Sequence, residues 1–285
     1  MRTAAGRELA RTGHARHNFI MAFTLVLVAA IGLAGCGSDR ETPYVERPVG
    51  TLYNTAMDAL LDGRTLPAAK QFDEVERQHP YSVWATKAQL MAAYSLYQSE
   101  KYPDAILALD RFIQLHPSNP DAAYAYYLKA ICYYEQISDV GRDQRSTQLA
   151  LKALDEVVRR FPDSEFARDA RLKMDLTYDH LAGKEMDVGR FYLRQRHYLA
   201  AINRFRVVVD QYQTTSHVPE ALHRLAESYR ALGMVDEARK VAAVLGHNYP
   251  GSDWYDDSYQ LVEKNRLQGD AAERGWFRRA LGSIF

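Results

Sequence analysis

Hydrophobic positions recur at helical spacing through almost the whole chain after residue 51. Apolar side chains separated by three or four residues fall on one face of a helix, which is the pattern of a helix packed against a core. The clearest stretch comprises Ala221, Leu222, Leu225, Ala226, Tyr229 and Leu232. A convincing alternation of period two, which would indicate strands, does not accompany it. The pattern therefore predicts an all-α fold.

A recurring break divides this helical pattern into units. Each break places an aromatic ring before proline, and Ser, Asp, Asn or Gly follows within two residues. Proline cannot continue the preceding helix, and a polar residue after it can cap the next one. The breaks stand at 79–82, 116–119, 161–164 and 249–252, with a degenerate copy that lacks proline at 212–215. A second break, such as Leu232-Gly233, lies inside several units, so each unit is predicted to be a helical hairpin.

These hairpins resemble tetratricopeptide repeats, and we predict a solenoid of about five of them with a capping helix over residues 51–268. An inserted loop is expected at 138–146 in the third hairpin, and a long first helix is expected in the fourth. Solenoids need such a cap because a terminal repeat otherwise leaves one face uncovered. The hairpins are predicted at 51–80, 82–117, 120–162, 164–213 and 216–250, and the cap at 252–268.

The amino terminus has the pattern of an export signal. An arginine-containing stretch precedes an apolar run from Phe19 to Leu33, which is shorter than the roughly 20 residues that a membrane-spanning helix needs. The run ends in Leu-Ala-Gly-Cys at 33–36, which resembles the bacterial lipobox. We predict that residues 1–35 are removed as a signal peptide. A plain signal peptide or a signal anchor is the alternative.

The resemblance to a lipobox implies that Cys36 becomes the first residue and carries lipid, as N-palmitoyl and S-diacylglycerol groups. More than one acyl chain gives stable anchoring where a single chain does not. Residue 37 is glycine, whereas an aspartate there would resemble a signal for retention in the inner membrane. We therefore expect the protein to be anchored in the outer membrane, on its periplasmic face. Residues 36–50 contain two prolines and no period, so we expect the lipidated cysteine to be followed by a flexible tether.

Charge and cysteine content narrow the class of protein. The chain has 36 basic and 36 acidic residues and zero formal net charge, which argues against a nucleic-acid partner. The second of its two cysteines, Cys132, lies in a predicted packed helix and is interpreted as a buried small apolar residue.

The sequence does not suggest catalysis. It contains no glycine-rich phosphate loop, no HExxH metal motif and no G-x-S-x-G nucleophile turn. The repeats use nearly all of the mature chain, which leaves no room for a catalytic domain. We therefore predict that the protein is not an enzyme, with no catalytic or metal site and no cofactor other than the covalent lipid.

Short motifs along the body match one family of lipoproteins in order and spacing. They are YNTAM at 53–57, HPYSVWA at 79–85, LDRFI at 109–113, RDQ at 142–144, FPDSEFA at 161–167, RFY at 190–192 and YLAAINR at 198–204. Over roughly residues 50–265 the chain resembles the BamD family, also called YfiO or ComL, which are lipoproteins of the β-barrel assembly (BAM) machine.

The resemblance implies a scaffold that binds the periplasmic domains of BamA, meets other BAM lipoproteins, and receives unfolded outer-membrane proteins for insertion. Two alternatives remain open at the level of sequence. One is a generic repeat lipoprotein that serves another complex of the cell envelope. The other, disfavoured by the absence of a catalytic domain, is a lipoprotein enzyme with a helical accessory domain.

Two sets of site residues follow from the resemblance. Asn203-Arg204 matches a family pair whose arginine contacts BamA, although an intrachain salt bridge or a solvated arginine is the alternative. Arg111-Phe112 matches the second repeat near the client groove, where several rings can add aromatic surface. These rings are Tyr81, Trp84, Tyr94 and Tyr126. The alternative is that the rings simply pack between hairpins.

The carboxyl end departs from the repeat pattern. At 269–285, Trp276, Phe277 and Ile284 share one helical face, and two arginines lie opposite. A basic amphipathic helix of this kind suits an anionic membrane or a partner groove, whereas a frayed chain end is the alternative.

Overall fold

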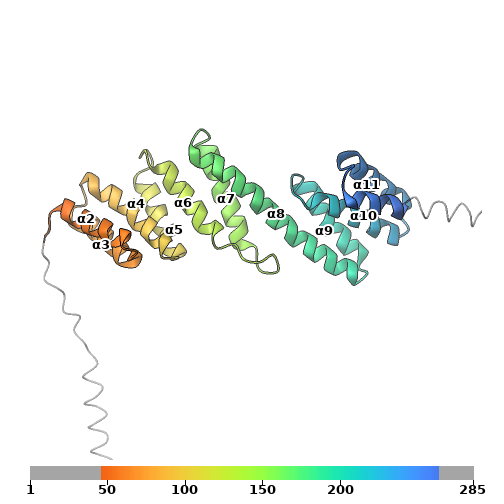
Figure 1. Ribbon diagram of the computed structural model, residues 1–285, viewed down its shortest axis with the longest axis horizontal. Coiled ribbons are helices and arrows are strands. Elements are labelled where there is room, and N and C mark those ends of the chain that lie inside the picture. The colour runs from red at the N-terminus through yellow and green to blue at the C-terminus, as the bar shows by residue number, and fades with distance from the viewer. Residues whose placement is uncertain (1–45, 263–285) are drawn as a thin grey trace, which may run out of the picture. The chain divides into compact units, whose positions relative to one another are not determined.

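A computed structural model describes residues 46–262, and within this range every regular element is a helix. The helices belong to one compact unit that begins at Arg47. They are α2 (Val49–Leu61), α3 (Thr65–Gln78), α4 (Val83–Gln98), α5 (Tyr102–Leu115), α6 (Ala122–Tyr134), α7 (Arg145–Arg160), α8 (Glu165–Arg194), α9 (Tyr198–Gln211), α10 (Val218–Ala231) and α11 (Val235–Asn248) (Figure 1). The predicted signal peptide, Cys36, most of the tether and the tail at 269–285 lie outside the described residues.

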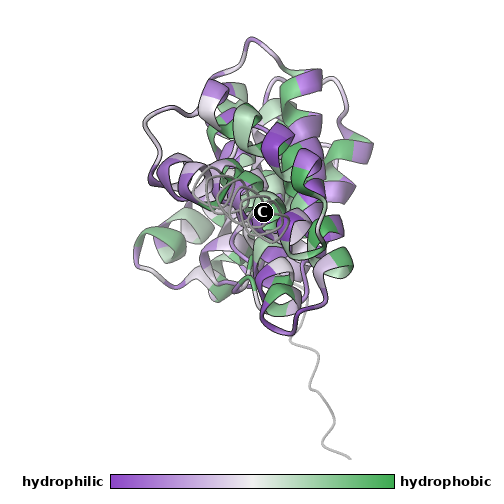
Figure 2. Ribbon diagram, turned by 90° about the vertical axis from the view of Figure 1, so that its right-hand side faces the viewer, coloured by the Kyte–Doolittle hydropathy of each residue, from purple (hydrophilic) through white to green (hydrophobic). Residues whose placement is uncertain are grey.

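Consecutive helices pair into antiparallel hairpins, and the hairpins follow one another in chain order (Figure 1). The first helix of one hairpin also touches the first helix of the next, as α2 touches α4 and α6 touches α8. Green and purple segments alternate along single helices in Figure 2, as expected of helices that bury one face. The prediction of an all-α solenoid of helical hairpins is confirmed.

The aromatic residue of each recurring break ends the second helix of a hairpin in one fixed backbone geometry. At all five positions φ lies between −125° and −135° and ψ between 45° and 59°. The backbone N–H of each aromatic residue donates to the carbonyl oxygen of the residue four positions earlier, which is a buried Val, Phe or Leu. The five residues are His79, His116, Phe161, Tyr212 and Tyr249.

The turn inside a hairpin is a second recurring device. Gly63 and Gly233 adopt φ of 75° and 78°, and Glu100 and Arg196 occupy the same left-handed region at 58° and 60°. Glycine suits this region because it has no Cβ, whereas the two charged residues hold it at a conformational cost. The turn at Arg196 is not evident in the sequence, since no glycine or proline accompanies it.

The third hairpin replaces this turn with the loop 135–144 between α6 and α7. The buried side chain of Gln144 holds the loop together. Its amide donates to the Arg142 carbonyl oxygen at 3.0 Å, and its Oε1 accepts from the Thr147 hydroxyl at 2.9 Å. The His180 ring on α8 lies 3.0 Å from the same oxygen, so the loop is tied to the next hairpin.

The start of α2 differs from the sequence expectation. Helix α2 begins at Val49, inside the range assigned to the tether, because Pro48, with φ of −55°, sets the backbone at the start of the helix. The long first helix of the fourth hairpin, α8, begins at Glu165, where the Ser164 hydroxyl accepts from the Ala167 N–H at 3.2 Å. Residues 253–262 are helical in the range expected for the cap, and 263–268 lie outside the described part of the chain.

Candidate functional site

Two hollows stand out on the described surface, and both involve α8. The α8–α9 hollow has a volume of about 230 Å³ and is lined by Tyr192, Ala200, Asn203, Arg204 and Val207. The α6–α8 hollow has a volume of about 400 Å³ and is lined by Tyr127, Glu165, Phe166, Arg168, Asp169 and Leu172. Each combines apolar surface with a few charged groups, which is the composition of a surface that binds protein segments.

The α8–α9 hollow brings the predicted pair Asn203 and Arg204 together on the exposed side of α9. One guanidinium nitrogen of Arg204, Nη1, donates to Glu185 Oε2 on α8 at 3.1 Å. The Arg204 side chain is nevertheless 45% exposed. A guanidinium has five N–H donors in a fork, so this single contact leaves donors for a second carboxylate.

Apolar surface adjoins this arginine. Tyr192, at the edge of the hollow, has its ring 5.7 Å from the exposed ring of Phe191. Leu199 is 68% exposed and directly precedes Ala200 of the lining. The combination of a half-exposed arginine with aromatic and aliphatic surface has the composition found at the centres of protein interfaces.

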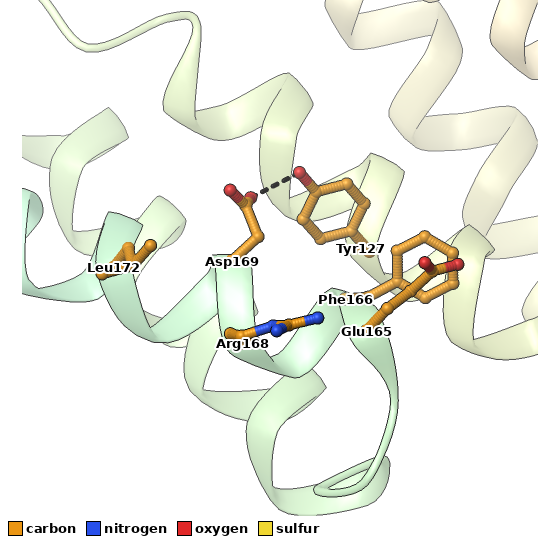
Figure 3. A pocket seen from close by; sticks show the side chains of 6 residues that line it. All are labelled: Tyr127, Glu165, Phe166, Arg168, Asp169 and Leu172. Carbon is orange, nitrogen blue, oxygen red and sulfur yellow. Dashed lines mark hydrogen bonds between the residues drawn. The ribbon is translucent and has the colours of Figure 1, made fainter.

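The α6–α8 hollow is organised by one hydrogen bond between its helices (Figure 3). The Tyr127 hydroxyl on α6 donates to Asp169 Oδ2 on α8 at 2.5 Å, and Lys173 Nζ lies 2.9 Å from the same oxygen. The hydrogen bond from Tyr127 is the main cause that lowers the pKa of Asp169. Burial, followed by this hydrogen bond, raises the pKa of Tyr127. Tyr127 therefore remains a donor to an ionised Asp169 at neutral pH.

The rest of this hollow offers apolar and cationic surface. The Phe166 ring stacks on Tyr127 with centroids 5.2 Å apart. Leu172 is 62% exposed, and Leu176, one helical turn further along α8, is 59% exposed. Arg168, drawn in Figure 3, has no ion-pair partner among the described residues. The sequence signal that could have revealed this surface is the pair of leucines on an otherwise charged face of α8.

Comparison with known proteins identifies the family of this chain. Residues 46–245 match the YfiO family, described as outer membrane lipoproteins. The chain belongs to the YfiO family. It is 53% identical to a protein of Caulobacter vibrioides over 246 residues, which cover 85% of this chain and 80% of that protein.

A Rickettsia prowazekii protein is 48% identical over 238 residues, which cover 84% of this chain and 95% of that protein. Both relatives bear the name outer membrane protein assembly factor BamD. A solved tetratricopeptide-repeat protein of Thermus thermophilus is 18% identical, with a TM-score of 0.36, over 75% of this chain and 98% of that chain.

The six residues expected at a client groove of this YfiO family member do not line either hollow. Tyr81 lies in the turn between α3 and α4, and Trp84 and Tyr94 lie on α4. Arg111 and Phe112 lie on α5, and Tyr126 lies on α6. The sequence could not show that these residues lie apart, because helical spacing does not reveal which face of a hairpin a ring occupies.

The expectation that Phe112 offers surface to a client is wrong, because the side chain is only 1% exposed. It belongs to the core cluster with Leu109 and Leu128, and its ring lies 5.2 Å from the His116 ring that ends the same helix. Tyr126 is half-buried against Phe161 of the next break, with ring centroids 5.4 Å apart. For these two rings, the alternative of packing between helices describes the structure.

The neighbouring Arg111 is exposed but pairs with Glu76 on α3. It therefore links the first two hairpins, and its charge is partly neutralised. Cys132 is fully buried, and burial raises the pKa of its thiol to about 12. The interpretation of Cys132 as a small core residue is confirmed, since a protonated, inaccessible thiol is unreactive.

Between residues 46 and 262, no three His, Cys, Asp or Glu side chains are arranged to hold a metal ion. Over the same range, the helices are too short or too polar to cross a bilayer.

Proposed function

We propose that this chain is a scaffold lipoprotein of the machinery that assembles β-barrel proteins into the outer membrane. The observation that carries the proposal is the pair of relatives named as BamD assembly factors, matched at 53% and 48% identity over 80% and 95% of their own lengths. A row of helical hairpins with separate surface hollows suits a protein that holds partners together without chemistry of its own.

The proposed anchor is lipid on Cys36, after removal of residues 1–35. The description of the family as outer membrane lipoproteins supports this assignment, as does the lipobox-like sequence before Cys36. N-palmitoyl and S-diacylglycerol chains together give lasting attachment. The helical hairpins then work at the periplasmic face of the outer membrane.

The proposed docking surface for the periplasmic domains of BamA is the α8–α9 hollow. Arg204 is held over the hollow by Glu185 and keeps donors for a partner carboxylate, and Asn203 lies beside it. Exposed Phe191 and Leu199 add apolar area that a partner can cover. Other lipoproteins of the BAM complex are proposed to bind other hairpins of the same scaffold.

The proposed contact surface for unfolded clients is centred on the α6–α8 hollow. An unfolded outer-membrane protein presents extended segments in which apolar side chains alternate with polar ones. Leu172, Leu176 and the Phe166 ring provide apolar contacts, and Arg168 provides a cation without a partner in the described chain. Tyr94 on α4, which is half-buried, extends aromatic surface along the preceding first helix.

Capture from solubilised envelopes tests the proposal, with BamA detected by antibody. Arg204→Glu places a negative charge beside Glu185 and is expected to remove most of the captured BamA. Arg206→Glu is the matched control, since Arg206 is exposed on the same helix and its nearest carboxylate, Asp210, is 3.9 Å away. The control is expected to capture BamA as the parent chain does.

A parent chain that captures no BamA contradicts the assembly-machine proposal and favours a repeat lipoprotein of another envelope complex. Equal capture by the parent and by folded Arg204→Glu keeps the assembly role but removes the α8–α9 hollow from the docking surface. Circular dichroism of each variant establishes that the helices are intact.

A further inference from the structure

A cluster of exposed apolar and basic side chains lies at the turn between α3 and α4 and at the start of α4. Tyr81 is fully exposed, Val83 is 77% exposed, and the Trp84 ring is partly exposed beside Tyr53, with ring centroids 4.8 Å apart. Lys87 Nζ lies 5.6 Å from the centre of the Trp84 ring. We call Tyr81, Val83, Trp84 and Lys87 the α3–α4 turn patch. Neither described hollow includes any of these four residues.

The chemistry of the patch is that of the zone between lipid headgroups and acyl chains. Tyr and Trp are enriched there because each has an apolar ring and a polar atom that stays hydrated. Lysine suits the same zone, because its aliphatic stem lies along apolar surface while the ammonium reaches the headgroups. Tyr81 and Val83 make few contacts with the folded chain, so covering them with lipid removes apolar surface from water.

The patch also lies close to the point at which the chain leaves toward the proposed anchor. The Arg47 N–H donates to Gln78 Oε1 at 2.9 Å, and the Arg47 carbonyl oxygen lies 2.7 Å from His79 Nε2. These bonds hold Arg47 against the end of α3, and Tyr81 follows His79 by two residues. Arg47 and the patch are therefore at the same end of the first hairpin.

The chain between Cys36 and Arg47 limits how far this end can be from the membrane. The two positions are 11 residues apart, so a fully extended chain spans at most about 40 Å between them. That distance is comparable with the thickness of a single bilayer. A lipidated Cys36 thus keeps Arg47, and with it this end of the first hairpin, within about 40 Å of the membrane surface.

We propose that the α3–α4 turn patch rests in the headgroup zone of the membrane that holds the lipid anchor. The chain then meets the bilayer at two points, the acyl chains of Cys36 and this patch, and the first hairpin has a fixed face toward the membrane. The proposal rests on the lipidation of Cys36 in the proposed function. It assigns Tyr81 and Trp84 to lipid rather than to the client groove expected from the sequence.

Site-directed spin labelling of the full mature lipoprotein tests this contact. Val83→Cys carries a nitroxide, while the thiol of Cys36 is taken by lipid and Cys132 is buried. Leu199→Cys is the matched control, because Leu199 is similarly exposed at the start of α9. The chain is reconstituted in vesicles of phosphatidylethanolamine and phosphatidylglycerol, and collisions with oxygen and with a water-soluble nickel chelate are compared.

The expected result at residue 83 is a several-fold fall in nickel collisions and a rise in oxygen collisions, relative to the label at residue 199. Equal accessibility of the two labels on vesicles that retain the protein overturns the patch proposal and leaves the anchor standing. Failure of the protein to float with the vesicles overturns the anchor and, with it, the patch. Protection at residue 83 only after an unfolded barrel protein is added overturns lipid contact in favour of client binding.

Discussion

Gly189 of α8 faces the ring of Phe205 of α9 so closely that a Cβ on Gly189 would lie 2.4 Å from the Cε1 atom of the ring. Phe205 is fully buried and belongs to the largest core cluster, which extends from α8 to the residues after α11. The absence of a side chain at residue 189 therefore sets how closely α8 and α9 approach. These are the two helices that form the proposed BamA surface.

Gly189→Ala is expected to destabilise the fold. The new methyl group must displace a buried ring, and overpacking of this kind costs about 1–3 kcal/mol. Better helix propensity offsets about 1 kcal/mol of that cost. Gly50→Ala in α2 is the control, because a Cβ there has open space and should leave stability unchanged or raise it. Urea unfolding followed by circular dichroism measures both, and a Gly189→Ala midpoint at or above that of the parent chain contradicts the packing described here.

Glu100→Gly and Arg196→Gly are expected to raise stability. Both residues hold a left-handed backbone, with φ of 58° and 60°, at the turn inside a hairpin. Glycine relieves a strain of about 1 kcal/mol or more but gains freedom in the unfolded chain, so the net gain is up to about 1 kcal/mol. Gly233→Ala, at the equivalent turn in the last hairpin, should have the opposite sign. Thermal melts compare the three variants, and a lower midpoint for both glycine substitutions would disprove the strain.

The recurring helix ends and the buried helix faces could be predicted from the sequence because they depend on residues that are close together in the chain. The proline after His79 or Phe161 restricts the preceding residue directly, and the helical spacing around Leu222 and Leu225 reports one buried face. The turn at Arg196 could not be predicted, because the hairpin imposes a left-handed backbone on a residue that does not favour it.

The surfaces were less predictable because they depend on neighbours that are distant in sequence. Whether Phe112 faces a client or the core is decided by the packing of α5 against α4 and α6, which no local pattern contains. The α6–α8 hollow is lined by Tyr127 and Asp169, which are 42 residues apart in the sequence and hydrogen-bond to each other across two hairpins. In contrast, the pair Asn203 and Arg204 is predicted from its resemblance to a family motif, and a motif of two adjacent residues is visible in the sequence alone.

The helical segment 253–262 is expected to detach from α10 more easily at acidic pH. His223 Nδ1 on α10 lies 2.8 Å from the Ser258 hydroxyl oxygen, and the imidazole ring packs beside Trp254. Burial, followed by the charge of Arg224, lowers the pKa of His223 below 6.5, although Glu220, Glu227 and Asp257 oppose this shift. The folded state therefore favours the neutral ring, and its stability falls as the pH drops below about 6.5 and the unfolded chain takes up a proton.

Unfolding midpoints at pH 7.5 and pH 5.5 measure this effect, with His223→Gln as the comparison. The parent chain should lose more stability than His223→Gln between the two pH values. An equal loss in both proteins would show that His223 is not the group responsible.

A photocrosslinking side chain at Leu172 is expected to capture unfolded outer-membrane proteins. Leu172 lies in the α6–α8 hollow and is 62% exposed, so a client in the hollow passes within reach of it. The control is the same side chain at Leu107 on α5, which is also strongly exposed but lies in neither hollow. Electrophoresis of irradiated vesicles with added client should show a product several-fold stronger at residue 172. Equal products at both positions would contradict a client surface centred on this hollow.

The central claim is that the chain promotes assembly of β-barrel proteins in the outer membrane. The most direct measurement is the folded fraction of barrel proteins in cells depleted of the chain, because a folded barrel migrates differently from an unfolded one in unheated gels. The account predicts that depletion lowers the folded fraction, that the parent chain restores it, and that Cys36→Ala and Arg204→Glu restore it less well than Arg206→Glu does. A folded fraction that stays unchanged after complete depletion would contradict the account.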